Sequence, residues 1–254
     1  MQEIPNYPSL KEKVVLITGG ASGIGSSIVE KFLQQGSKVV FLDKEVELGK
    51  SLVEKFDGFY HKSIFRECDL LNITDMQNII KEIQKDIGPI SILVNNAAND
   101  ERHSIDDVTP EFWDNRMNTN LRHYFFTVQS VYKDMKNLGE GSIINIGSYS
   151  WILAQGGMPG YTTAKSAIMG LTRTLARDLG IYNIRVNCVV PGWIITERQR
   201  KLWLTPEIEK ETLNRQCIKK LLEPEDISKV VLFFASNQSS GITAQNYIVD
   251  GGIA

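Results

Sequence analysis

The chain has 254 residues, of which 42% are apolar and 23% charged, and its 28 Lys+Arg against 30 Asp+Glu give a formal net charge of −2. This composition is that of an ordinary globular protein with enough apolar residues for a core, which excludes a disordered chain, a collagen-like repeat and a coiled coil. Because the sequence has no basic stripe to neutralise phosphates, a nucleic-acid partner is not expected.

The cysteines and histidines favour neither disulfides nor a metal. Cys68, Cys188 and Cys217 are scattered and odd in number, and the three histidines share no ligand spacing with them or with one another. We therefore expect a reducing compartment and no bound metal. The N-terminus does not have the pattern of a signal peptide, and apolar runs such as 230–235 are too short to cross a bilayer, so a soluble cytoplasmic protein is expected.

Short β-branched runs alternate with longer segments of helical period along the whole chain. The pattern predicts strands at 14–17, 38–42, 65–68, 90–94, 142–146, 184–190 and 247–249. Between them it predicts helices at 25–35, 45–56, 161–179 and 223–234. Two further helices are predicted from their ends: one is capped by Thr74 and ended by Gly88-Pro89, and the other runs from Thr109-Pro110-Glu111 to about Lys136.

Alternation of this kind is typical of a doubly wound α/β fold, in which helices cover both faces of a parallel sheet. No linker, repeat or low-complexity tract divides the chain. We predict one domain over 1–254, with 192–222 as the one stretch that interrupts the rhythm.

A glycine-rich segment, Thr18 to Gly25, lies between the first strand and the first helix. Glycines let a backbone approach a pyrophosphate closely, and the following helix N-terminus supplies amide donors. The spacing G-x-x-x-G-x-G differs from the G-x-G-x-x-G fingerprint, and a plain tight turn is the alternative. Its position after an apolar strand favours a dinucleotide loop.

Asp43 ends the second strand, where a carboxylate can bind the adenosine ribose hydroxyls and repel a 2′-phosphate. This predicts NAD as the cofactor. A surface aspartate with no such role is the alternative, and the adjacent Lys44 keeps NADP possible. Asp69, at the end of the third strand, is a candidate for contact with adenine, although it could equally be an ordinary loop residue.

The pattern Tyr-x-x-x-Lys would place a phenol and a cation on one helix face, and the cation could bring the phenol into use as a general base near neutral pH. It occurs three times, at Tyr7/Lys11, Tyr132/Lys136 and Tyr161/Lys165. Ligands bind outside the carboxyl ends of the strands in an open α/β sheet, which favours the third pair because it opens a helix that follows a strand.

Two further polar residues are candidates for the same site. Ser148 follows the predicted strand 142–146 and could hold the substrate oxygen. Alternatively, Ser148 and Ser150 could both be loop residues with no role in the site. Asn120 lies inside a predicted helix, where asparagine is disfavoured and often has a polar task.

Together these motifs resemble the short-chain dehydrogenase/reductase family over nearly the whole chain. The matching segments are Thr18 to Gly25, Asn95-Asn96-Ala97-Ala98, Asn120, Ser148, Tyr161/Lys165, and Pro191-Gly192 with Thr196. Ala98 stands where the family usually has glycine, and Gly147 where serine is common. The resemblance implies a Rossmann-type seven-stranded sheet of order 3-2-1-4-5-6-7 and a homotetramer.

The resemblance also implies roles for individual residues. Tyr161 would be the general acid/base, Lys165 would hold the nicotinamide ribose and lower the pKa of the phenol, Ser148 would orient the substrate oxygen, and Asn120 would fix a water in a proton relay. Asn95 would lie beside the adenosine ribose and Thr196 near the carboxamide. The expected cofactor contacts are Gly19, Ser22, Gly23, Ile24, Gly25, Asp43, Asp69, Leu70, Asn95, Ala97, Tyr161, Lys165, Pro191, Gly192, Ile194 and Thr196.

The segments expected to line the substrate pocket combine tryptophan rings with many hydrogen-bonding groups, which suits a sugar better than a steroid or acyl chain. Trp203 and Arg102 could instead pack a helix and face water, respectively. The predicted substrate residues are Asn99, Arg102, His103, Ser150, Trp151, Gln155, Trp193, Arg198 and Gln199.

The strings 95–103 and 191–199 resemble those of aldose 1-dehydrogenases within the family. The hypothesis is NAD-dependent oxidation of an aldose at C1 to its lactone, with a small polar substrate. The alternatives are a reductase of 3-oxoacyl thioesters or other ketones, and a non-catalytic NAD-binding scaffold. Asp43 argues against the first, and the intact set of Asn120, Ser148, Tyr161 and Lys165 argues against the second.

Overall fold

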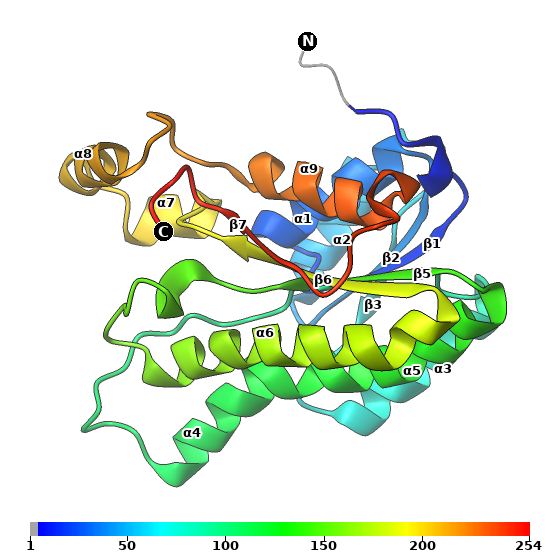
Figure 1. The fold of residues 1–254 in the computed structure, drawn as a ribbon, viewed down its shortest axis with the longest axis horizontal. Coiled ribbons are helices and arrows are strands. Elements are labelled where there is room, and N and C mark those ends of the chain that lie inside the picture. The colour runs from blue at the N-terminus through cyan, green and yellow to red at the C-terminus, as the bar shows by residue number, and fades with distance from the viewer. Residues whose placement is uncertain (1–4) are drawn as a thin grey trace.

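Seven parallel strands form one sheet in the order β3-β2-β1-β4-β5-β6-β7 in this computed structural model, which describes residues 5–254 (Figure 1). This confirms the predicted fold class and strand order. The strands are β1 Val14–Thr18, β2 Lys38–Asp43, β3 Ile64–Glu67, β4 Ile92–Asn95, β5 Gly141–Ile146, β6 Ile184–Pro191 and β7 Asn246–Val249.

Helices cover both faces of the sheet, with α1, α2 and α9 on one side and α3, α5 and α6 on the other (Figure 1). The α-helices are α1 Gly23–Gln34, α2 Val46–Lys55, α3 Ile73–Asp86, α4 Pro110–Met117, α5 His123–Leu138, α6 Pro159–Leu179, α7 Glu197–Leu202, α8 Pro206–Arg215 and α9 Pro224–Ala235. Short 3₁₀ turns lie at Pro8–Leu10, Tyr149–Trp151, Gly180–Tyr182 and Asn237–Ser239.

The central strands are apolar at consecutive positions because both of their faces are buried. In β1, Val15 and Ile17 pack toward α1 and α9, whereas Val14 and Leu16 pack toward the layer of α3 and α5. Successive side chains of a strand point to opposite faces, so a strand between two helical layers needs an unbroken apolar run.

Two details of the predicted helices are wrong. The cap of α3 is Asn72, whose Oδ1 accepts a hydrogen bond from the amide of Asp75 at 3.2 Å, while Thr74 lies within the first turn. The helix expected from Thr109 to about Lys136 is instead α4 and α5 joined by a π-helical turn at Asn118–Arg122. Periodicity averages over such a turn, because its single extra residue does not interrupt the apolar pattern.

The irregular region 192–222 contains α7 and α8, which Figure 1 shows together at one end of the molecule. An isolated parallel β-bridge between Ile194 and Leu222 joins the two ends of this region. The prediction of one domain over 1–254 stays a prediction, and its residues 1–4 lie outside the described part. Within residues 5–254 no helix is long and apolar enough to span a membrane.

Candidate active site

A cavity of about 910 Å³ opens where the carboxyl ends of the central strands meet α7 and α8. This is the edge of an open α/β sheet at which ligands bind. Of the site residues expected from the sequence, all but five line it. The exceptions are Gly23, Asn95, His103, Asn120 and Trp151.

The glycine loop forms one wall of the cavity, and it is too crowded for larger residues. A Cβ on Gly25 would lie 1.9 Å from the carbonyl oxygen of Gly19, and Gly19 itself has a φ of +65°. Asn96 holds the loop from outside by donating from Nδ2 to the carbonyl oxygens of Thr18 and Gly19, at 3.1 and 2.8 Å. The contribution of Asn96 is absent from the expected site residues.

The N-terminus of α1 faces this loop with no side chain capping it, since the Ser22 hydroxyl makes no cap hydrogen bond. Free amides and the helix dipole favour a bound phosphate group at such a position. The narrow glycine cradle and the uncapped helix end together fit the pyrophosphate of a dinucleotide.

Asp43 lines the cavity at the end of β2. Its Oδ2 accepts from the amide of Ala21 at 3.0 Å, and its Oδ1 accepts from the amide of Glu45 at 3.1 Å. These two bonds fix the carboxylate beside the glycine loop, so the position carries a negative charge in a set orientation.

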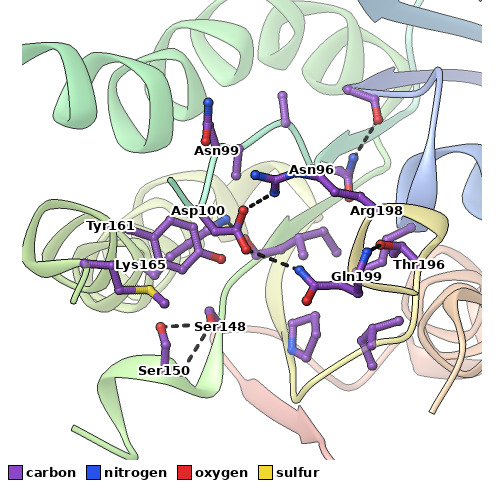
Figure 2. A pocket seen from close by; sticks show the side chains of 18 of the residues that line it. Asn96, Asn99, Asp100, Ser148, Ser150, Tyr161, Lys165, Thr196, Arg198 and Gln199 are labelled. Carbon is purple, nitrogen blue, oxygen red and sulfur yellow. Dashed lines mark hydrogen bonds and ion pairs between the residues drawn. The ribbon is translucent and has the colours of Figure 1, made fainter. Parts of the chain in front are cut away.

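Tyr161 and Ser148 meet at the other end of the cavity, from the first turn of α6 and from the segment after β5 (Figure 2). Burial raises the pKa of Tyr161 to about 12, and a hydrogen bond with Ser148 opposes that shift. The charge of Asp100 also raises the pKa of Tyr161, whereas the charges of Arg102 and Arg198 lower it. The Ser148 hydroxyl donates to Oγ of Ser150 at 3.0 Å, which sets its direction.

Lys165 lies one helical turn after Tyr161 and is almost completely buried. Its Nζ donates to the carbonyl oxygen of Ile146 at 2.8 Å and to the phenol oxygen of Tyr124 at 3.1 Å. Burial lowers the pKa of Lys165 to about 8. Tyr124 is absent from the sequence prediction, because nothing in its local pattern separates it from an ordinary core aromatic.

Asn120 does not line the cavity. It is fully buried in the π-helical turn, where Oδ1 accepts from the amide of Asn99 at 2.8 Å and Nδ2 donates to the carbonyl oxygen of Arg116 at 3.0 Å. These contacts tie the loop after β4 to the helix beneath it.

Two of the expected contacts, Asn95 and His103, do not line the cavity and make other hydrogen bonds. Asn95 is fully buried away from the cavity, where it donates to Asn145 Oδ1 at 3.1 Å and accepts from the Thr127 hydroxyl at 2.7 Å. The Nε2 of His103 accepts a hydrogen bond from the amide of Gly160 at the start of α6, at 3.2 Å.

Two more expected contacts lie just outside the cavity. Trp151 faces a separate small hollow beside α6, and Gly23 begins α1 next to the cavity without lining it.

Charged and aromatic side chains enclose the end near Tyr161. Arg198 of α7 pairs with Asp100 of the loop after β4, and Gln199 Nε2 donates to the same carboxylate at 3.4 Å (Figure 2). Gln199 Oε1 accepts from the indole of Trp193 at 2.8 Å. Arg102 lies 5.7 Å from the ring centroid of Trp203.

Arg116 also lines this end of the cavity and is absent from the expected set. It is buried, pairs with Glu101 at 2.8 Å and lies 5.1 Å from the ring centroid of Phe112. A single arginine near the end of an eight-residue, mostly polar helix gives no local signal of such a position.

Residues 19–254 match the family model described as "Enoyl-(Acyl carrier protein) reductase". The chain is 46% identical over 246 residues to the D-xylose 1-dehydrogenase of Caulobacter vibrioides, with 97% of each chain covered. It is 43% identical over 248 residues to a Rhizobium meliloti protein named "Probable galactose dehydrogenase GalD", again with 97% of each covered. The solved structure of the Thermoplasma acidophilum aldohexose dehydrogenase (AldT) matches with a TM-score of 0.85 at 30% identity, over 98% of this chain and 96% of that one.

Proposed function

The chain belongs to the short-chain dehydrogenase/reductase family and is an NAD(P)-dependent oxidoreductase of CH–OH groups, and on that premise we propose that it oxidises an aldose at C1 to the lactone with NAD. The observation that carries the proposal is the meeting of Tyr161, Ser148 and Lys165 at one end of a cavity whose other end holds the glycine loop and Asp43. The names of the xylose, galactose and aldohexose relatives support a sugar substrate.

The reaction removes a hydride from C1 and a proton from the C1 hydroxyl, so that the carbon is oxidised by two electrons. The bound nicotinamide supplies the hydride acceptor. In the proposed mechanism Tyr161 takes the hydroxyl proton on its phenol oxygen, and Ser148 hydrogen-bonds the same substrate oxygen. The Lys165 ammonium stabilises the phenolate form of Tyr161, because its positive charge favours the negative state of a neighbour.

In this proposal the glycine loop and the N-terminus of α1 bind the pyrophosphate, while Asp43 selects NAD over NADP. A carboxylate accepts hydrogen bonds from a ribose diol and repels a 2′-phosphate. The test compares kcat/KM for the two cofactors in the wild type and in Asp43→Ser. The variant should lose preference for NAD, and an unchanged ratio would remove Asp43 from cofactor selection.

We propose that 192–222 selects the substrate. Trp193 offers an apolar face for the C–H side of a sugar, and Arg198 and Gln199 offer donors for its hydroxyls; Arg102, from the loop after β4, adds a further donor to this segment. All four line the cavity beside Tyr161, while a long acyl chain would need a more uniformly apolar wall.

A panel of pentoses, hexoses and 3-oxoacyl thioesters, assayed with both cofactors through the absorbance of the reduced nicotinamide, tests the substrate class. Turnover of aldoses with NAD, and a product that reacts as a lactone with hydroxylamine, is expected. Reduction of oxoacyl thioesters with no turnover of any sugar would contradict the proposal and favour the ketone reductase. The homotetramer and the cytoplasmic location are further proposals from the family, and light scattering of the purified chain tests the tetramer.

A further inference from the structure

The ammonium of Lys165 lies between two tyrosine rings, at 5.3 Å from the ring centroid of Tyr124 and 5.7 Å from that of Tyr161. Tyr161 lines the cavity, whereas Tyr124, on α5, is fully buried behind the lysine. One phenol is therefore available to substrate and the other only to the protein.

Three polar atoms form a closed triangle at this point. Nζ of Lys165 donates to the carbonyl oxygen of Ile146 at 2.8 Å and to the Tyr124 hydroxyl oxygen at 3.1 Å, and the Tyr124 hydroxyl donates to the same carbonyl at 3.0 Å. The hydroxyl proton of Tyr124 is committed to Ile146, so its oxygen faces the ammonium as an acceptor. The hydroxyl is thereby fixed in its rotation.

No carboxylate forms an ion pair with Lys165 among residues 5–254. Its nearer titratable neighbours stay neutral near pH 7: burial raises the pKa of Tyr124 well above its usual value, raises the pKa of Cys188 to about 12, and lowers the pKa of His123 to about 4. On the lysine's own helix, burial raises the pKa of Tyr161 to about 12.

Two acidic groups raise the pKa of Lys165: the thiol of Cys188, and then the carboxylate of Asp100 in the loop after β4. Asp100 is itself paired with Arg198. Neutral oxygen atoms therefore supply the close support for a buried positive charge, and Tyr124 provides one of the two that are present.

We propose that Tyr124 is a positioning residue for Lys165. The Tyr124 hydroxyl, fixed by its bond to Ile146, orients the Lys165 ammonium so that the third N–H of the ammonium is left for the cavity. An ammonium has three donors, and the triangle uses two of them on atoms that cannot move away. The remaining donor faces the side on which Tyr161 and a bound ribose would lie. The proposal rests on the role given to Lys165 above, but it does not depend on which substrate the enzyme takes.

The test is Tyr124→Phe, which removes one oxygen and retains the ring, compared with Tyr132→Phe, the same change on the same helix. Without its acceptor the protonated form of Lys165 loses support, so its pKa should fall by about one pH unit, as expected for one hydrogen bond to a charged group. The pH titration of Lys165 is followed by NMR of the chain labelled with ¹³C-lysine, with the resonance assigned by its loss in Lys165→Arg. This readout needs neither substrate nor cofactor.

The kinetic counterpart is the alkaline limb of kcat/KM, measured with whichever substrate the panel identifies. It should move to lower pH in Tyr124→Phe and stay in place in Tyr132→Phe. A Lys165 titration in Tyr124→Phe that superimposes on that of the wild type would overturn the proposal, whatever the substrate proves to be.

If Tyr124→Phe does not fold, 3-fluorotyrosine at position 124 replaces it. That residue retains the hydroxyl but makes its oxygen a weaker acceptor, so a smaller downward shift of the Lys165 titration is expected. An unshifted titration would again refute the positioning role. A failure of the sugar assay alone would count against the proposed substrate and leave this result intact.

Discussion

Lys165→Met should make the protein more stable while it abolishes turnover. The lysine is 1% exposed, and burial lowers its pKa from 10.5 to about 8. A difference of two to three pH units corresponds to about 3 kcal/mol of free energy by which folding disfavours the charged form. Methionine fills a similar volume without a charge, and the carbonyl of Ile146 retains the Tyr124 hydroxyl as its donor.

The sign of the pH dependence follows from the direction of this shift. Between pH 8 and 10.5 the unfolded chain binds more protons at this lysine than the folded chain does. The contribution of Lys165 to the free energy of unfolding of the wild type therefore rises with pH over this range. The advantage of Lys165→Met is therefore greatest below pH 8 and disappears by about pH 10.5. We expect a gain of about 2 to 3 kcal/mol near pH 7 and about 1 kcal/mol near pH 9.5.

Urea unfolding of wild type and variant at both pH values, at one protomer concentration, measures this difference. Lys31→Met is the matched control, because Lys31 is also largely buried but has a carboxylate partner, Glu225, at 2.8 Å. The control should lose about 1 kcal/mol, since it leaves Glu225 with one cation fewer. A Lys165→Met variant that is less stable than the wild type near pH 7, or one whose advantage does not change with pH, would refute the reasoning.

Three further variants test other parts of the site. Tyr161→Phe should lower kcat by about 10²- to 10⁴-fold, because the proton acceptor is lost. The Kd for NAD, measured by fluorescence quenching, should be unchanged. Full turnover would mean that another group takes the proton. Gly25→Ala should abolish detectable NAD binding, or prevent folding as judged by a circular dichroism melt, since its methyl group would lie 1.9 Å from the Gly19 oxygen. Wild-type affinity for NAD would show that the loop relaxes around the methyl group. His103→Ala should lower the free energy of unfolding in urea by about 1 kcal/mol and change KM little, because His103 accepts a hydrogen bond from the amide of Gly160. A large rise in KM would indicate that His103 contacts the substrate.

Apart from α7 and α8, which lie in the stretch 192–222 for which no helix was expected, the strands and helices could be predicted closely, because the two-residue period of strands and the 3.6-residue period of helices can be read from the local sequence. The apolar run at 14–17 and the amphipathic run at 161–179 correspond to β1 and α6 within a few residues. The order of the strands was available only through the resemblance to a family, since alternation alone does not say which strands are neighbours. The π-helical turn at Asn118–Arg122 depends on contacts of Asn120 with Asn99 and Arg116, and one of these comes from a distant loop.

The glycine loop and the Tyr161/Lys165 pair could be placed because both are tied to the end of a strand, a position that the pattern defines. Asn95 shows the limit of that rule. It ends β4 and makes hydrogen bonds with Tyr124 and Thr127 of α5, whereas its neighbour Asn96 reaches the glycine loop. One step along a strand reverses the direction of a side chain, and a motif that contains both residues does not say which one faces the ligand.

The substrate end is harder to predict for a related reason. Segment 99–103 has no regular period, so the direction of each side chain is set by its distant partner: Asp100 by Arg198 on α7, and His103 by Gly160 on α6. His103 is therefore not among the lining residues, although Asp100, three residues earlier, lines the cavity. Chemistry that depends on regular elements can be located from the sequence, while the choice of substrate depends on loops whose side chains are oriented only once the whole chain has folded.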